Sequence, residues 1–121
     1  MKKSLLLLIL AIIFLSGCVP QTMYYWGNYS HTLYNYKKDP GDEALAKHKN
    51  CIENIISKSN SWNKKVPPGV YCEYGYYLIM EGNIEGGLEY LDLEVNEYPE
   101  SQKFVQTLKD QLLMEKENFD E

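Results

Sequence analysis

The amino-acid sequence predicts an all-α fold: two helical hairpins and a C-terminal capping helix, preceded by a signal peptide. Apolar residues recur at helical spacing in five segments between Trp26 and the C-terminus. Proline and glycine residues separate these segments, as turns between helices require. No segment of this region alternates apolar and polar residues in the manner of a half-buried strand. We therefore assign residues 24–121 to one helical domain.

Residues 1–17 have the composition of a secretion signal. Lys2 and Lys3 supply the positive start, and an uncharged apolar run extends from Leu5 to Leu15. This run is about half the length that spans a bilayer. The segment therefore predicts a cleaved signal peptide and not a permanent transmembrane helix.

The end of this segment, Leu15-Ser16-Gly17-Cys18, resembles the lipobox of bacterial lipoproteins. The resemblance implies cleavage between Gly17 and Cys18, acylation of the Cys18 sulfur, and residues 18–23 as a lipidated tether. Each buried methylene contributes ~0.8 kcal/mol, so several acyl chains on one residue anchor stably. The alternative is an ordinary signal peptide that ends near a cysteine by chance. Val19 stands where an Asp would resemble an inner-membrane retention signal, so we expect the periplasmic face of the outer membrane, with the inner membrane as the alternative.

Cleavage at this position would leave an acidic chain. Removal of Lys2 and Lys3 lowers the basic count from 12 to 10 against 17 acidic residues, which gives a formal charge of −7. The sequence also contains no Arg. Nucleic-acid binding depends on Lys and Arg contacts to phosphate, so the charge balance excludes that function. The same balance predicts that no polybasic patch assists the lipid anchor.

The first two predicted helices flank the turn sequence Asp39-Pro40-Gly41. The first extends from about Trp26 to Lys38, because its aromatic and apolar residues recur at i, i+3 and i+7. The second begins with Asp42 as N-cap and ends near Ser59. Its apolar stripe consists of Leu45, His48, Ile52, Ile55 and Ile56, and we expect His48 to pack in the core and not to bind a metal.

The third and fourth predicted helices form the second hairpin. Pro67-Pro68-Gly69 opens the third helix, which ends near Glu81, because proline is tolerated in a first helical turn. Gly82-Asn83 fits a tight turn, and the fourth helix extends from Ile84 to about Glu97. Ser101 then caps a fifth helix, whose apolar residues are Phe104, Leu108 and Leu112.

The third and fourth helices also resemble a tetratricopeptide repeat, a 34-residue helix-turn-helix unit. With Pro99 at the closing proline, Tyr71 takes the aromatic position and Gly75 the position where the two helices approach. Glu94 replaces a small residue, so we expect looser packing there. The first two helices resemble a more eroded copy. Hairpins of this kind cannot bury their apolar faces alone, and stacking supplies a shared core.

Several runs of the mature chain carry a further resemblance: Tyr24-Tyr25-Trp26-Gly27-Asn28-Tyr29-Ser30, Leu33-Tyr34, Lys37 to Pro40, Glu43-Ala44-Leu45, Val66-Pro67-Pro68-Gly69-Val70-Tyr71 and Tyr98-Pro99-Glu100-Ser101. Together they resemble the lipoproteins of the DUF4810 family. The resemblance implies a CsgG-like lipoprotein and a third small lipoprotein as companions, and it supplies no established activity to carry over to this chain. The chain departs from the family pattern at Cys51 and Cys72, for which a disulfide and two separate thiols both stay open.

The sequence contains no motif that carries catalytic chemistry. His31 and His48 are its two histidines, and they lack metal-ligand spacing. Neither a Gly-rich phosphate loop nor a nucleophile-elbow motif is present. The 11 tyrosines provide no base at neutral pH, because the unperturbed phenol pKa is ~10. We therefore predict a protein that is not an enzyme and has no metal or cofactor.

The repeat resemblance implies that the first helix of each hairpin lines a concave groove. The positions it selects are Cys72, Tyr76, Ile79 and Met80 in the second hairpin, and His31, Tyr34 and Asn35 in the first, with Tyr24 at the rim. Tyr and Met bury large apolar area and adapt to a partner. We predict that this groove binds a peptide or helix of another envelope protein. The alternative is that these tyrosines complete a small core.

Two functions are compatible with these features. The first is a lipid-anchored, non-enzymatic adaptor in an outer-membrane complex with a CsgG-like lipoprotein. The alternative is a periplasmic activator of a peptidoglycan synthase. The short tether, residues 18–23, favours the adaptor, because reaching an inner-membrane enzyme requires a long extended linker.

Overall fold

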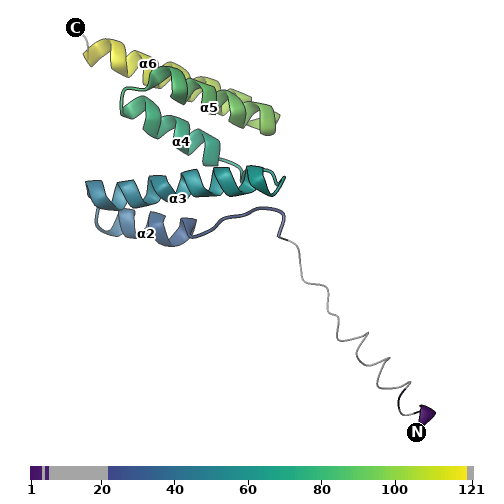
Figure 1. Ribbon diagram of the computed structural model, residues 1–121. Coiled ribbons are helices and arrows are strands. Elements are labelled where there is room, and N and C mark those ends of the chain that lie inside the picture. Colours follow the sequence, from purple (N-terminus) through teal and green to yellow (C-terminus); the bar gives the residue numbers. More distant parts are fainter. Residues whose placement is uncertain (4, 6–21, 120–121) are drawn as a thin grey trace.

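The computed structural model describes residues 1–3, 5 and 22–119 (Figure 1). Between residues 22 and 119 it contains five α-helices, one 3-10 helix and no strand, which confirms the all-α prediction. Most of the predicted signal peptide and the lipobox, residues 6–18, lie outside the described residues. Within the described ranges, no helix combines the length and the apolar character that crossing a bilayer requires.

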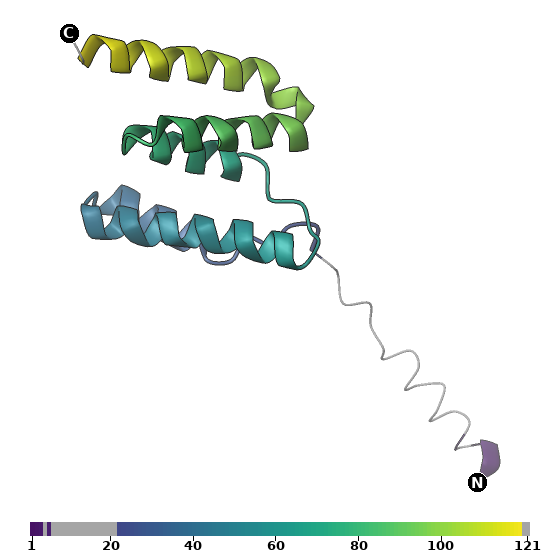
Figure 2. The same cartoon turned by 45° about the horizontal axis from the view of Figure 1, so that its top comes forward.

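The helices form an antiparallel stack. In chain order they are α2 (Tyr29–Lys38), α3 (Asp42–Ser61), α4 (Val70–Met80), α5 (Ile84–Glu97), the 3-10 helix η1 (Pro99–Ser101) and α6 (Gln102–Phe119). Figures 1 and 2 show the hairpin of α2 and α3 at one end of the stack, the hairpin of α4 and α5 in the middle, and α6 beside α5. The two predicted hairpins and the additional C-terminal helix are therefore present.

The first two helices begin differently from the prediction. α2 begins at Tyr29 and not at Trp26, because Gly27 has φ +48° and belongs to a turn that precedes the helix. Asp42 is the first residue of α3 and not its N-cap, because Gly41 occupies the cap position in an extended conformation. Asp42 still favours the helix start, since an acidic side chain in the first turn complements the helix dipole.

The starts of α4 and α6 also differ from the prediction. The range Pro67–Pro68 precedes α4, and Gly69 caps the helix with φ +86°, so the prolines are not part of its first turn. Ser101 lies in η1, and its hydroxyl donates to the carbonyl of Tyr98 at 2.7 Å. The predicted N-cap role of Ser101 for the last helix is therefore wrong, because its hydroxyl proton bonds backwards along the chain.

Small residues set the approach of α4 and α5. Gly82, with φ +97°, turns the chain, and the side chain of Asn83 caps α5 by accepting from the N–H of Gly86 at 3.1 Å. A Cβ at Gly75 would lie 2.6 Å from the carbonyl oxygen of Gly87, a distance at which the helices would have to separate. The role expected for Gly75 in the helix approach is confirmed.

Two groups of buried side chains stabilise the stack. The first joins α3 to α4 and consists of Ile52, Ile55, Ile56, Val66, Val70 and Tyr71. The second joins α4, α5 and α6 and consists of Cys72, Ile79, Leu91, Val105 and Leu112. α6 is thus an integral part of the core and covers one side of α4 and α5.

Candidate partner-binding surface

Two residues of the predicted groove are core residues. Cys72 is 7% exposed and Ile79 is completely buried, and both belong to the second core group, which includes Val105 and Leu112 of α6. The prediction assumed that the side of α4 bearing these positions faces solvent, but α6 packs against that side. Cys72 and Ile79 therefore cannot line a partner-binding surface, and this part of the prediction is wrong.

Two other predicted residues line a groove between α2 and α3. This groove has a volume of about 980 Å³ and includes His31 and Asn35, whose Nε2 and Nδ2 atoms lie 3.0 Å apart. Its other lining residues are mostly of polar type, with Asn28, Asn50 and Asn54 among them, and Tyr25 is its one tyrosine. The groove therefore differs from the tyrosine- and methionine-lined groove that the sequence predicts.

The remaining predicted residues lie apart from this groove. Tyr76 and Met80, one turn apart on α4, are 37% and 52% exposed, and we call them the α4 patch. Tyr34 is exposed on α2, whereas Tyr24 is half-buried. The eight predicted residues do not form one groove, and their exposed apolar members are Tyr34 on α2 and the α4 patch.

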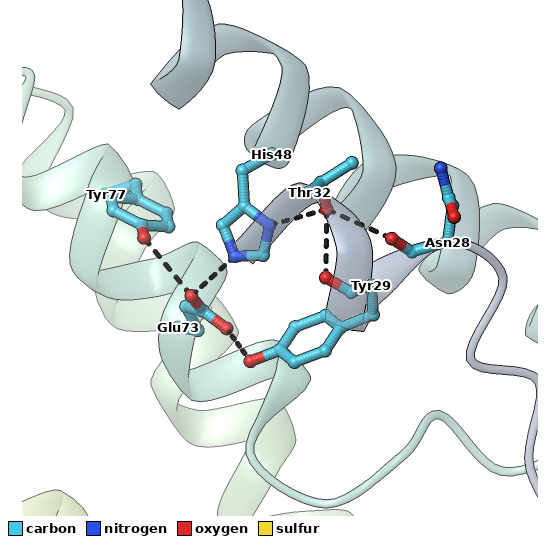
Figure 3. A network of polar contacts seen from close by, with 6 residues as sticks. All are labelled: Asn28, Tyr29, Thr32, His48, Glu73 and Tyr77. Atoms are coloured by element: carbon cyan, nitrogen blue, oxygen red, sulfur yellow. Dashed lines mark hydrogen bonds and ion pairs between the residues drawn. The ribbon is translucent and has the colours of Figure 1, made fainter. Parts of the chain in front are cut away.

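A polar network that the sequence did not predict connects three helices (Figure 3). Glu73 of α4 is at its centre. Its Oε1 atom accepts from the Nε2 of His48 at 2.9 Å and from the hydroxyl of Tyr77 at 3.1 Å, and its Oε2 atom accepts from the hydroxyl of Tyr29 at 2.6 Å. The other ring nitrogen of His48, Nδ1, lies 2.8 Å from the hydroxyl of Thr32 on α2. We call these five residues the Glu73 network.

The Glu73 network holds its members in fixed positions by hydrogen bonds. His48 is completely buried, as expected, and its partners satisfy both ring nitrogens. Burial, followed by the bond to Glu73, raises the pKa of Tyr29. Burial and the charge of Glu73 likewise raise the pKa of Tyr77. Both phenols therefore stay protonated at neutral pH and act as donors to the carboxylate.

A signal for this network exists in the sequence. A histidine on an apolar stripe requires hydrogen-bond partners when it is buried. Glu73 is the only acidic residue of α4, and a single acid in an otherwise apolar and aromatic helix is a candidate partner. The pairing of His48 with Glu73 joins residues 25 positions apart, which sequence periodicity alone does not address.

A second buried carboxylate stabilises the start of α4. Glu94 of α5 is almost completely buried, and its oxygens accept from the backbone N–H groups of Gly69 at 2.7 Å and Cys72 at 3.3 Å. The first N–H groups of a helix have no partner within the helix, so this carboxylate supplies a cap from a neighbouring helix. The expected loosening at Glu94 is therefore wrong: the acid binds α4 to α5.

Comparison with known proteins identifies the family of this chain. The family described as a domain of unknown function (DUF4810) matches residues 23–108, which is more than half of the sequence, so the chain belongs to this family. No curated protein and no solved structure matches it.

Proposed function

We propose that this DUF4810 protein is a membrane-anchored periplasmic lipoprotein and a non-enzymatic protein-protein interaction adaptor. In this proposal it works in an outer-membrane complex with a CsgG-like lipoprotein and a third small lipoprotein. The observation that carries the proposal is the α4 patch: Tyr76 and Met80 expose large apolar side chains on a helix whose other side is core. Exposed Tyr and Met are adaptable contact residues for a partner protein.

The scaffold behind the α4 patch supports a binding role. The ring of Tyr76 lies 5.7 Å from the ring of Tyr77, which donates to Glu73. The patch therefore adjoins a network that fixes α4 against α2 and α3. A surface on well-packed helices loses little conformational entropy when it binds, which favours recognition of a specific partner.

The anchor at Cys18 supplies the membrane half of the proposal. Cys18 follows the lipobox-like sequence, and the helical domain begins 11 residues later at Tyr29. A spacer this short would hold the domain close to one membrane. The proposed partners are lipoproteins of that same membrane, so the short spacer suits a complex among anchored proteins.

The test of the binding role is photo-crosslinking in cells from a reactive amino acid placed at Tyr34, with identification of the captured protein. We expect capture of the CsgG-like lipoprotein in the parent chain and its loss in the double variant Tyr76→Lys, Met80→Glu. Phe104→Lys, a change to an exposed aromatic residue of α6, is the matched control and should leave capture unchanged. Unchanged capture by a correctly folded double variant would remove the α4 patch as the site. Capture of a peptidoglycan synthase would support the activator function in place of the adaptor.

The anchor is tested separately. Labelled palmitate should enter the parent chain and not the Cys18→Ser variant, and only the parent chain should fractionate with outer membranes. Absence of label in the parent chain would contradict the lipid anchor without bearing on the α4 patch.

A further inference from the structure

We propose that the end of the domain next to the tether is a membrane-contacting face that binds the headgroup region of an anionic phospholipid bilayer. This anchor face consists of Met23, Tyr25, Trp26, Lys58, Trp62 and Lys64. The inference rests on the proposed anchor at Cys18 and adds a second contact with the same membrane, made by the folded domain itself.

The anchor face is joined to the proposed lipid attachment at Cys18 by a short stretch of chain. The backbone carbonyl of Thr22 accepts from the Nζ of Lys64 at 3.0 Å, so the tether leaves the domain beside the C-terminal end of α3. Figures 1 and 2 both show the chain after residue 22 passing that end of α3. Cys18 precedes Thr22 by four residues, which span at most about 14 Å. The lipid attachment therefore keeps the anchor face within a short distance of the bilayer surface.

The exposed apolar residues of the face are of the interfacial type. The chain has two tryptophans: Trp62 caps the C-terminal end of α3, and Trp26 follows Tyr25 in the chain and is 43% exposed. Trp62 is 53% exposed and Met23 is 73% exposed. The ring of Tyr25 packs against Trp62 at 4.9 Å and connects the tether side to the α3 side. Trp and Tyr concentrate at membrane-water interfaces, where an amphipathic ring contacts both apolar and polar surroundings.

The charge of the face is positive although the chain is acidic. The Nζ of Lys58 lies 5.3 Å from the ring centre of Tyr25 and 5.8 Å from that of Trp62, so this cation is held among the aromatic rings. Lys64 is the second cation, and the sequence between Glu53 and Glu73 contains no acidic residue. Overall composition predicts no polybasic patch near the anchor, and the face has two lysines only: folding places Lys58 beside Tyr25 and Lys64 beside Thr22.

Lysines close to an anionic bilayer strengthen binding about fivefold each, and the effect fades within a Debye length. The tether spans at most about 14 Å, so it allows Lys58 and Lys64 to come within this distance of the bilayer. Lys65 is not part of the face. Its ammonium group lies over the ring of Tyr98, and the acidic residues Glu97 and Glu100 are close to Tyr98 in the sequence.

The exposed α4 patch ends near Met80, at the opposite end of the stack (Figure 1). A domain resting on its anchor face would therefore present the α4 patch away from the membrane.

The experiment uses the full acylated protein in vesicles of phosphatidylcholine and phosphatidylglycerol in equal parts. The Trp26→Phe variant leaves Trp62 as the sole reporter, and phosphatidylcholine brominated near the headgroup end of its acyl chain is the quencher. We expect quenching and a blue shift of Trp62 emission. Lys58→Gln with Lys64→Gln should lower the ratio of docked to undocked protein about fivefold for each lysine. The control pair Lys37→Gln and Lys38→Gln, at the far end of α2, changes the net charge equally and should leave that ratio unchanged.

Several results would overturn the proposal. Trp62 emission that stays unquenched while flotation shows the protein on vesicles would exclude membrane contact by this face. Equal effects of the two lysine pairs would exclude a specific role for Lys58 and Lys64. Protection of Trp62 from iodide in cells but not in vesicles would assign the face to a partner protein instead. Palmitate labelling tests the Cys18 anchor separately from the face. An unlabelled protein whose Trp62 still docks on anionic vesicles would contradict the anchor and support the anchor face. An unlabelled protein whose Trp62 does not dock would contradict both the anchor and the anchor face.

Discussion

Removal of the Glu73 carboxylate provides a direct test of how the hairpins are held together. In Glu73→Ala, the Nε2–H of His48 and the hydroxyls of Tyr29 and Tyr77 lose their common acceptor. The two phenols are half-buried and can turn toward water, but His48 is completely buried and cannot. The loss is therefore greater than that of one surface hydrogen bond.

The expected magnitude follows from the three bonds. A buried donor left without a partner costs about 1–3 kcal/mol, and each half-buried phenol adds about 0.5–1 kcal/mol. We expect Glu73→Ala to lower the free energy of unfolding by about 3 kcal/mol. Glu73→Gln should cost only about 1 kcal/mol, because its carbonyl can replace Oε1 for His48 and Tyr77 while its amide donates to the hydroxyl of Tyr29. The order of the two substitutions is the specific part of this prediction.

Urea unfolding followed by far-UV circular dichroism measures both changes at a fixed protein concentration. Glu53→Ala is the matched control, since Glu53 is exposed and accepts one bond, from Tyr74 at 2.7 Å. It should change the free energy of unfolding by less than about 0.5 kcal/mol. Equal losses for Glu73→Ala and Glu73→Gln, or a loss no larger than that of the control, would show that the network does not stabilise the stack.

Three further predictions concern other parts of the core. Gly87→Ala should lower the free energy of unfolding by about 1–3 kcal/mol, because its Cβ would lie 2.6 Å from the backbone oxygen of the facing glycine in α4; Gly41→Ala, whose Cβ would meet nothing within 4 Å, should cost less than about 1 kcal/mol in the same denaturation assay, from the weaker preference of Ala for the N-cap alone. Burial raises the pKa of the Cys72 thiol from 9.0 to about 11, so its alkylation at pH 9, followed by mass spectrometry, should be about 50-fold slower in the folded chain than in urea. Because the pKa is raised in the folded chain, the contribution of the Cys72 thiol to stability is complete below pH 9 and is lost as the pH rises through about 11. Equal alkylation rates in the folded chain and in urea would contradict the burial of Cys72. Tyr98→Phe removes a bond of 2.6 Å to the carbonyl of Val66 and should lower thermal stability by about 1–3 kcal/mol; an unchanged melting temperature would mean that water replaces the phenol.

The sequence was sufficient for those parts of the fold that local patterns determine. α5 has the predicted bounds, Ile84–Glu97, because a Gly-Asn turn precedes it and a proline follows it. α2 begins later than predicted because Gly27, inside a helical apolar pattern, adopts a positive φ. Periodicity in the sequence shows which side chains would share one face of a helix. It does not show whether the backbone is a helix or a turn where the apolar residues keep the same spacing in the sequence.

The surface was less predictable than the fold, because it depends on contacts between distant segments. Of the groove positions predicted on α4, Tyr76 and Met80 are exposed, whereas Cys72 and Ile79 are buried in the core group that α6 completes. No local pattern specifies on which side of a hairpin the next helix packs. Cys51 and Cys72 are separate free thiols, and Cys72 belongs to the core group that α6 completes. The question that the sequence left open at these cysteines is therefore decided by tertiary packing.

α2 is the element whose stability depends most on polar contacts. Its ten residues include none that is fully buried, and an isolated helix of this length is unstable in water. The attachments of α2 are the half-buried Tyr29 and Thr32, both part of the Glu73 network, and the stacking of Tyr36 on His48. In the proposed lipid-anchored protein, α2 is the first helix after the tether and its connecting turn. We therefore expect α2 amides to exchange with deuterium by local opening, at a lower free energy than those of α4 and α5, which the second core group holds. Hydrogen exchange monitored by mass spectrometry reports this order, and Glu73→Ala should accelerate α2 selectively. Exchange of α2 only together with α4 and α5 would show a single cooperative unit, in which case the network adds to global stability and does not specifically retain the first helix.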